Sequence, residues 1–341
     1  MSPLRIGLPA PVRGRIAALD ELKGVAIILV ILYHAGGVLG LRDVLHGEVG
    51  VDFFVILSGV GLTLSARREG AGRFLLRRFW RIYPAYWIAL TVFLVADACF
   101  RDTTFGTTDI ALHYLGIHGW FGDVYAMGIN DSFWFVTLIV TLYVLYLPLR
   151  RILGRADRLL LAGAVVSVVP ILAYFYAGQA AIFAHMALRI PGFFLGLLIG
   201  TLLRDGRLEI PLSAKTAAAF LILFYVTYAL GIIVASVLIG FVGMLAYAAI
   251  VRPALNERAR RDLRFLGDRS LEIFLIHQPL IREYNVLVLD WLFPGSGKSP
   301  MALTLGMCVG LAVTLALASG LHVLLARIRL PGADPAPLPA T

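Results

Sequence analysis

The residues of this sequence that could do chemistry in an apolar setting begin with a histidine. In the segment RIAALDELKGVAIILVILYHAGGVLG, residues 15–40, Asp20, Lys23 and His34 interrupt a long apolar run. At about 100° per residue, the step from Lys23 to His34 returns a helix to within roughly 20° of the same face, about 16 Å further along. Ionisable groups that face lipid are costly and mark functional sites. We therefore expect this stripe to face the protein interior, with His34 as a general base or a nucleophile.

A second histidine lies in the apolar segment FLGDRSLEIFLIHQPL, residues 265–280. Ser270 and His277 are seven positions apart and so share a helical face, and Pro279 follows where it would bend or open the helix. We expect His277 to be functional because burial of an ionisable group in a span is unfavourable; the alternative is an interhelical hydrogen bond. Glu272 and Arg269 are expected to pair with each other.

Arginines gather in the segment LLRRFWRIYPAYW, residues 75–87. Arg78 and Arg81 are three positions apart on one helical face, so they could clamp the phosphates of a nucleotide-bearing donor from the cytosol. The simpler interpretation is a cytoplasmic helix end with snorkelling arginines and an interfacial belt of aromatic side chains. That belt would consist of Trp80, Tyr83, Tyr86 and Trp87.

The segment GVDFFVILSG, residues 50–59, places Asp52 near a membrane boundary and Ser58 deeper in a span. Both could serve a site, and both have structural alternatives: a hydrated acid at a loop end, and packing of small residues between helices. A serine hydrolase and a zinc protease are disfavoured, because the sequence lacks a nucleophile-elbow motif and a zincin motif. The string GSGKS at 295–299 is not a phosphate-binding loop, because it lacks the first glycine of that motif. Scattered histidines and two distant cysteines predict no metal site and no disulfide.

The composition indicates an all-α polytopic membrane protein without a soluble domain. Of 341 residues, 60% are hydrophobic and 15% charged, with a mean hydropathy of +0.86. The net charge of +9 comes from arginines in short segments between apolar runs, the pattern of cytoplasmic loops, so we expect no nucleic-acid partner.

We expect about ten transmembrane helices, with both termini cytoplasmic, in one domain over residues 1–341 with its core at 15–325. The segment 326–341 reads as a disordered cytoplasmic tail, and 101–130 as an outer loop that holds His113, His118, Trp120 and Tyr125. The expected spans are 16–39, 49–65, 82–99, 133–149, 159–176, 190–203, two within 215–251, 265–289 and 301–325.

With these segments assembled, the sequence resembles membrane-bound acyltransferase family 3, bacterial enzymes that O-acylate surface glycans and some secreted glycosylated metabolites. The resemblance covers residues 15–325. It rests on the basic residue and histidine of LDELKGVAIILVILYH, on GVDFFVILSG, on the two arginines Arg78 and Arg81 of RRFWRIYPAYW, on RIPGFFLGLLIG and on LGDRSLEIFLIHQP, in that order.

The resemblance implies an acyl-coenzyme A donor, most often acetyl-coenzyme A, and a carbohydrate hydroxyl as acceptor, at an inner-membrane multi-pass protein with the lipid bilayer and glycan-assembly proteins as partners. No metal is implied. The site residues expected on this basis are, for catalysis, His34, Lys23 and Asp20; for the donor, Arg77, Arg78, Arg81 and Tyr83; and for the acceptor, Asp52, Ser58, Trp134, Ser270 and His277. Trp120 and Tyr125 are candidates for stacking on a sugar.

One departure from the family pattern lies after Trp134, where many members carry two glutamates and a glutamine but this chain has Ile139, Val140 and Thr141. Substrate analogy with the glutamate-bearing branch is therefore not carried over. The rival function is a non-enzymatic transporter or flippase that uses the buried histidines as a proton relay. The arginines beside the histidine and the lack of an internal repeat favour the enzyme.

Overall fold

The computed structural model describes residues 17–41, 47–65, 69–122, 128–153, 155–177, 186–205, 236–282, 284–285, 288 and 299–328. All regular secondary structure in these ranges is helical. The elements are α1 (Ala17–Leu39), α3 (Val49–Leu64), α4 (Ala71–Phe100), α5 (Thr107–Leu115), η1 (His118–Trp120), α7 (Trp134–Leu149), α8 (Ala156–Ala177), α10 (Ile190–Arg204), α12 (Ser236–Ala246), η3 (Tyr247–Val251), α13 (Arg252–Ala254), α14 (Glu257–Asp268), α15 (Ser270–Ile281) and α17 (Pro300–Ile328).

The all-α prediction is confirmed for the described residues, and the count of ten spans stays a prediction. Three helices are long and apolar enough to cross a membrane: α1, α4 and the Met301–Ile328 part of α17. Helices α3, α7, α10 and α15 are apolar but shorter. Most of the segment expected to hold two spans, and both chain termini, lie outside the described residues.

Two expected boundaries differ from the structure. Helix α4 begins at Ala71, eleven residues before the expected start at 82, because the arginine-rich entry is itself helical. The expected ninth span, 265–289, is interrupted at Arg269, where α14 ends and α15 begins. Helix α14 carries the basic run that was expected to be a loop, and its Asn256 N-cap accepts a hydrogen bond from the Ala259 amide at 2.9 Å.

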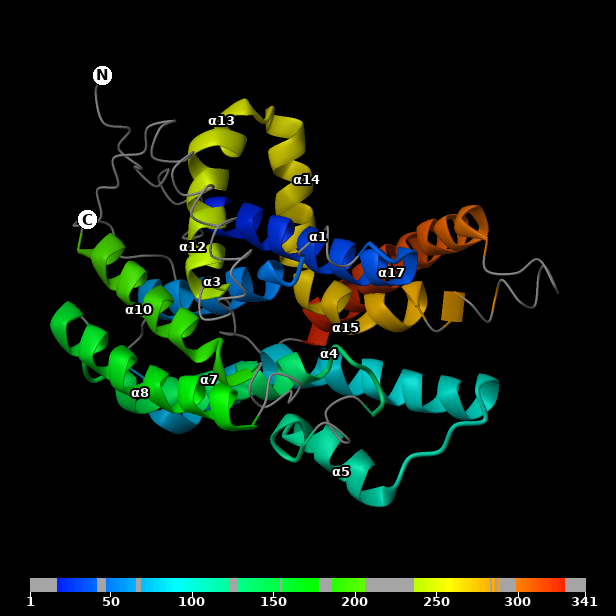
Figure 1. The fold of residues 1–341 in the computed structure, drawn as a ribbon, viewed down its shortest axis with the longest axis horizontal. Helices are drawn as coiled ribbons and strands as arrows, with labels where there is room; N and C mark the ends of the chain where they lie inside the picture. The colour runs from blue at the N-terminus through cyan, green and yellow to red at the C-terminus, as the bar shows by residue number, and fades with distance from the viewer. Residues whose placement is uncertain are drawn as a thin grey trace.

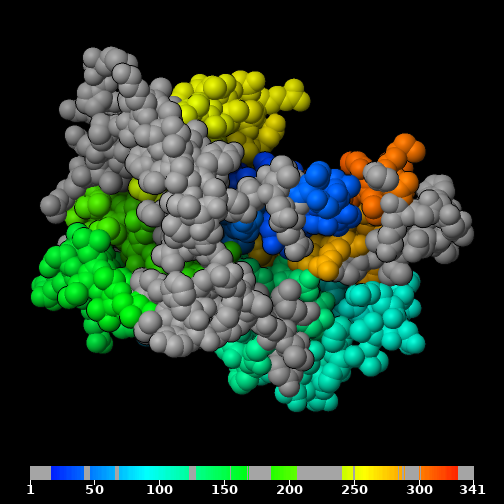
Figure 2. Space-filling model, viewed as in Figure 1, coloured from blue at the N-terminus to red at the C-terminus, as the bar shows by residue number. Residues whose placement is uncertain are grey.

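Helix α1 packs against α3, α14, α15 and α17 (Figure 1). Its contact with α14 is close because of two glycines. A Cβ at Gly267 would lie 1.9 Å from the Asp20 carbonyl oxygen, and one at Gly24 would lie 2.1 Å from the Leu263 carbonyl oxygen. Glycine at both positions therefore lets the two backbones touch. The α12–α14 segment projects from one side of the bundle (Figure 2, yellow).

Apolar side chains on the outside of the helices match a lipid environment. On α17, Leu305, Val309, Val313 and Leu317 recur every four residues and are exposed. On α4, Val92 and Val95 are more than half exposed. Because soluble monomers rarely expose such long apolar stripes, these faces fit a bilayer.

The segment after α4, which was expected as an outer loop, is partly helical and packs onto the bundle, and its side of the membrane stays a prediction. Helix α5 packs back along α4, and η1 packs against α7. His113 and His118 are fully buried, and their rings stack at 3.9 Å. Trp120 donates from Nε1 to Thr141 Oγ1 at 2.9 Å, so its ring is held by α7, and Tyr125 lies outside the described residues.

Candidate active site

Two histidines that are far apart in the sequence meet between α1 and α15. The rings of His34 and His277 lie 5.0 Å apart at an interplanar angle of 64°. The fully buried His277 and the partly buried His34 both stand on helices whose other neighbours are apolar. The structure thus brings together the two histidines that the sequence singled out independently.

The hydrogen bonds of His277 define its tautomer. Its Nδ1 lies 2.8 Å from the Phe274 carbonyl oxygen and 3.1 Å from that of Ile273. A carbonyl oxygen only accepts, so Nδ1 carries the hydrogen and Nε2 carries the lone pair. Nε2 is buried and has no hydrogen-bond partner within the described residues. An unpaired imidazole nitrogen of this kind is able to accept a proton.

Aromatic rings close the site beneath His277. Phe274 lies 5.7 Å from the His277 ring and 4.7 Å from Phe135 of α7. Phe54 of α3 contacts both phenylalanines, at 6.3 Å and 6.0 Å. Helices α3, α7 and α15 therefore converge on one cluster of aromatic rings, an apolar floor beside the fully buried His277.

The expected acceptor residues Asp52 and Trp134 share a third partner, Arg189. Asp52 is buried on α3, and its Oδ1 lies 3.7 Å from Arg189 Nε, beyond hydrogen-bond distance. The Arg189 guanidinium lies 5.1 Å above the Trp134 ring. Both carboxylate oxygens of Asp52 are buried without a hydrogen bond in the described part of the chain. Sequence reasoning did not count Arg189 among the site residues, although Arg189 is the first residue of the RIPGFFLGLLIG motif.

Ser270 lies away from His277 along α15, and Ser58 lies on another helix, α3. Ser270 is buried at the first position of α15, about 10 Å of helix rise from His277. Ser58 is half-buried on α3, beside Gly59, which packs directly on the Phe193 backbone of α10. The position of Ser58 also fits the structural alternative, close packing of small residues.

Asp20 and Lys23 form an ion pair of 2.9 Å at the opposite end of α1 from His34. Because α1 is one continuous helix, the eleven residues from Lys23 to His34 correspond to about 16 Å of rise. The backbone of Asp20 touches Gly267 of α14. The pair therefore belongs to the α1–α14 contact, and the structure does not bring it to His34.

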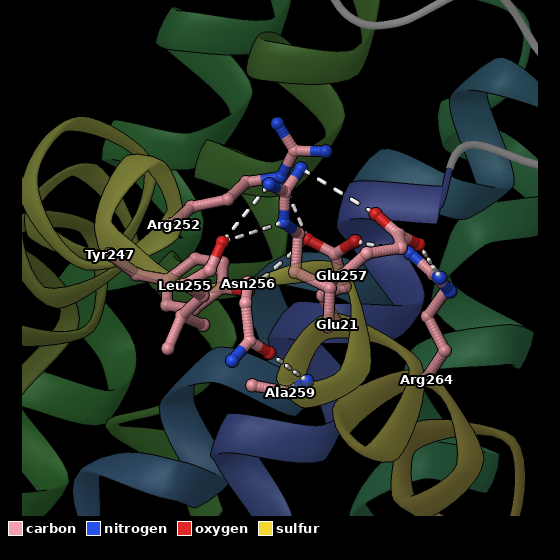
Figure 3. A network of polar contacts seen from close by, with 9 residues as sticks. Glu21, Tyr247, Arg252, Leu255, Asn256, Glu257, Ala259 and Arg264 are labelled. Atoms are coloured by element: carbon pink, nitrogen blue, oxygen red, sulfur yellow. Dashed lines mark hydrogen bonds and ion pairs between the residues drawn. The ribbon is translucent and has the colours of Figure 1, made fainter.

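Glu21, which sequence reasoning missed, anchors this end of α1 (Figure 3). The carboxylate is fully buried and accepts from Arg252 Nε at 2.7 Å, Arg264 Nη1 at 2.8 Å and Tyr247 Oη at 3.2 Å. Arg264 also donates to Glu257. Glu21 lies next to Asp20 in sequence, but its partners are more than 200 residues away, so no local pattern pointed to them.

The three expected donor-binding arginines occupy different environments. Arg77 pairs with Glu69, whereas Arg81 is exposed. Arg78 is 8% exposed, with its guanidinium 5.4 Å from the Phe74 ring and 5.1 Å from the Tyr143 ring. No carboxylate of the described chain pairs with Arg78. Arg78 and Arg81 therefore follow one helix but do not share one pocket wall.

Tyr83, also expected at the donor site, instead holds α5. Its hydroxyl donates to the Leu115 carbonyl at 2.8 Å. Tyr86 donates to the His113 carbonyl at 2.7 Å, and Trp87 to the Tyr114 carbonyl at 2.8 Å. Three aromatic side chains of α4 thus donate to three carbonyls at the C-terminal end of α5, of which that of His113 also accepts from the Gly116 amide at 2.8 Å.

A polar cluster beside His277 was also missed. Ser132 donates to Gln278, and Asn130 Nδ2 donates to the Leu275 carbonyl at 3.3 Å. Asn130 Oδ1 accepts from the Ser132 amide at 2.8 Å, so the turn before α7 is fixed on α15. The available signals were the run of polar residues at 130–132 and the glutamine directly after the histidine.

Glu272 does not pair with Arg269 as expected. It lies 3.0 Å from His322 Nδ1 of α17, and Arg269 stacks on Phe265 at 3.7 Å. The contact between Glu272 and His322 therefore joins α15 to α17. Within the described ranges, no group of three ligating side chains could hold a metal ion.

The sequence is similar to that of known proteins. The sequence profile of a family described as an acyltransferase domain matches residues 16–319. A protein of Komagataeibacter xylinus whose name describes it as a membrane-bound transacylase, BcsY, is 27% identical over 217 residues, which cover 58% of this chain and 54% of that protein. The chain thus spans about half the length of the curated relative that it matches. No solved structure matches the chain.

Proposed function

Since the chain belongs to acyltransferase family 3, we propose that it is an integral-membrane O-acyltransferase that moves an acyl group from acyl-coenzyme A to a carbohydrate hydroxyl. The group is acetyl, and the acceptor is a surface polysaccharide, a lipid-linked glycan or a glycosylated metabolite. The protein acts in the inner membrane, where the donor is cytosolic, with glycan-assembly proteins as partners. The family membership and the transacylase relative support the acyl transfer.

The observation that carries the proposal is the contact between His34 and His277. Two imidazoles 5.0 Å apart, beside an aromatic floor, provide adjacent proton-accepting and proton-donating nitrogens. A purely structural histidine pair would be expected to use its buried nitrogens in hydrogen bonds, whereas Nε2 of His277 is unpaired within the described residues.

In the first mechanism, one imidazole is a general base. It takes the proton from the acceptor hydroxyl while that oxygen attacks the thioester carbonyl, and a tetrahedral intermediate forms. The C–S bond then breaks, the thiolate of coenzyme A leaves, and the imidazolium returns the proton to the sulfur. The second histidine holds the first and stabilises its charged form in the transition state.

In the second mechanism, His34 is the nucleophile. Its lone-pair nitrogen attacks the thioester carbonyl, the C–S bond breaks, and the thiolate leaves and takes the N–H proton of the acylated ring, which leaves a neutral acyl-imidazole. The acceptor hydroxyl then attacks the acyl carbon, with His277 as the base that takes its proton; the C–N bond breaks, and His277 passes the proton to the released imidazole of His34. Label retained on the protein in the absence of acceptor distinguishes this route from the first.

Donor binding is assigned to Arg78, with Arg77, Arg81 and Tyr83 nearby on α4. The Arg78 guanidinium rests on two aromatic rings, which orient it and leave its N–H groups to bind phosphate. Arg77 is neutralised by Glu69, and the Tyr83 hydroxyl bonds to α5, so both contribute less. Asp20 and Lys23 act indirectly, by fixing the end of α1.

Acceptor binding is assigned to Asp52 and Trp134 around Arg189, with Ser58 and Ser270 towards the other ends of their helices. The unpaired carboxylate oxygens of Asp52 are suited to accept hydrogen bonds from hydroxyl groups. The transporter alternative gains no support from a specific contact, and family membership favours the enzyme.

The proposal is tested with the purified full chain in liposomes, radiolabelled acetyl-coenzyme A and the glycan fraction of the host membrane. We expect wild type to consume donor and to label glycan, and His34→Ala to do neither while it still folds and binds donor. Failure of wild type to bind or consume acetyl-coenzyme A and longer acyl-coenzyme A species would refute the enzyme and favour the transporter.

A further inference from the structure

A pocket of about 220 Å³ lies where α4 and α15 end and the turn before α7 begins. Its walls include six polar residues that no role above requires at this place: Asp97, Arg101, Asn130, Asp131, Arg282 and Tyr284. The aromatic ring of Phe93 and the backbone at Gly128 complete the cavity. The pocket is separate from the aromatic floor beside the histidines, because none of Phe54, Phe135 and Phe274 lines it.

Two acid–arginine pairs give this pocket a balanced charge. Asp97 Oδ1 accepts from Arg101 Nη1 at 3.1 Å and from Tyr284 Oη at 2.9 Å. Asp131 Oδ2 lies 2.5 Å from Arg282 Nη1. Two carboxylates and two guanidiniums sum to zero, so the pocket favours neither a phosphate nor a cation. It offers both acceptors and donors to a neutral ligand rich in hydroxyl groups.

Asp97 contributes an acceptor with capacity to spare. Its side chain is 2% exposed, and both of its described partners bind Oδ1. Oδ2 has no partner in the described part of the chain, although Asp97 lines the pocket. The Tyr284 ring lies nearly parallel to Phe93, at 6.3 Å and 23°. A carboxylate oxygen beside a flat aromatic surface is suited to one sugar ring, which has hydroxyls at its edge and C–H groups on its faces.

The pocket and the histidine pair lie on opposite sides of α15. His277 faces α1, whereas the pocket lies between α15 and α4, and Figure 1 shows α15 between these two helices. Pro279 lines the pocket two positions after His277, which corresponds to a rotation of about 200° around the helix. A helix with side chains is about 10 Å across, so a single sugar in the pocket is too short to span the distance to His277, whereas several linked sugars are long enough.

We propose that this pocket is a distal subsite that binds a neutral sugar unit of the acceptor, remote from the hydroxyl that is acylated. The proposal rests on the proposed function for its substrate class. Binding energy from such a remote subsite contributes to catalysis only with a polymeric acceptor, so the enzyme favours sugar chains over single sugars. Asn130 connects the pocket wall to α15, because it lines the pocket and also donates to the carbonyl of Leu275, two positions before His277.

A labelling experiment tests occupancy of the pocket without any acyl transfer. The variant is Gly128→Cys in a full chain in which Cys99 and Cys308 are serine, and the reagent is a membrane-impermeant maleimide. We expect millimolar maltotriose to slow labelling about threefold by mass action, and trigalacturonate to have no such effect. Asp97→Asn should abolish the protection, whereas Asp205→Asn, in an ion pair with Arg204 away from the pocket, should retain it.

Equal labelling with and without maltotriose, or equal protection by trigalacturonate, overturns the proposal. A transfer assay gives the second arm: Asp97→Asn should lower acetyl transfer to an oligosaccharide acceptor by about tenfold more than transfer to its monosaccharide unit. An equal loss for both acceptors also overturns the subsite. Because labelling needs no donor, loss of protection in an enzyme that transfers acetyl refutes the pocket alone. Absence of donor turnover with protection intact refutes the proposed function alone.

Discussion

The two ends of α1 treat buried polar groups in opposite ways. Near the start of the helix, Glu21 is fully buried and accepts hydrogen bonds from two arginines and a tyrosine. Near the other end, His34 meets His277, which is equally buried but has Nε2 unpaired within the described residues. One end of α1 therefore belongs to a satisfied polar network, whereas the other end contacts an imidazole of α15 that has one nitrogen without a hydrogen bond in the described residues.

This difference separates structural anchoring from chemistry. A buried carboxylate with all its partners joins elements rigidly, and its removal leaves arginines unpaired. A buried nitrogen without a hydrogen-bond partner lowers the stability of the fold. Such a nitrogen is typical of sites where a substrate or a proton binds to it. Asp52, whose two oxygens have no hydrogen bond in the described residues although Arg189 lies 3.7 Å away, belongs with His277 by the same criterion.

The largest expected effect is on catalysis at the histidine end. His34→Ala or His277→Ala should each lower the acetyl-transfer rate by about a thousandfold, because each removes a group that handles the proton or the acyl group. The rate is taken per folded molecule, because His277→Ala empties a fully buried site and should also lower the Tm. The matched control is His322→Ala, which should lower the Tm by stranding Glu272 but keep the rate per folded molecule. A similar rate loss per folded molecule in His322→Ala would remove the distinction between the two catalytic histidines and a structural one.

The next effect is on stability at the anchored end. Glu21→Ala should destabilise the protein by about 1–3 kcal/mol, because Arg252 and Arg264 lose a fully buried acceptor and Arg264 keeps only Glu257 among its described partners. Thermal unfolding in detergent measures it, with the transfer rate normalised to folded protein. The rate per folded molecule should stay within about twofold of wild type. An unchanged Tm with a large rate loss would place Glu21 in the active site.

A smaller effect separates the arginines of α4. Arg78→Gln should raise the KM for acetyl-coenzyme A by about tenfold, the value of one charge-assisted phosphate contact. Arg81→Gln should change it by less than about threefold, because Arg81 is exposed and its field is screened. Equal KM changes in both variants would instead support a clamp made by the two arginines together.

The smallest effect lies at the edge of the Glu21 network. The hydrogen bond from Arg264 holds the pKa of Glu257 below its usual value. A carboxyl group whose pKa is lowered on folding adds stability above its unfolded pKa and loses it as the pH falls. Glu257→Gln should therefore lower the Tm by at most about 2 °C at pH 7, and the difference should vanish near pH 3. A difference that grows on acidification would contradict this assignment.

The sequence predicted the features that depend on local periodicity. Apolar runs located the helices, and the cost of burying ionisable groups singled out His34 and His277 before any contact between them was known. Composition also predicted the membrane protein, and the ordered motifs predicted the family, which the comparisons confirm.

Features that depend on long-range pairing were not predictable. Glu21 reads as one more acid in a helix entry, and its role comes from Arg252 and Arg264 more than 200 residues later. The expected Glu272–Arg269 pair was wrong because the helices are interrupted at Arg269, which leaves Glu272 to face His322. Burial of His113 and His118 was hidden by the polar composition of their segment, which had suggested an outer loop.

The central claim is that His34 and His277 act as one unit, and a double-mutant cycle on the acetyl-transfer rate tests it most directly. Residues that share one catalytic step are strongly non-additive. We therefore predict that the double variant His34→Ala/His277→Ala transfers acetyl at about the rate of the slower single variant. A double variant slower by the product of the two single losses would contradict the account, because it would show that the two histidines act independently.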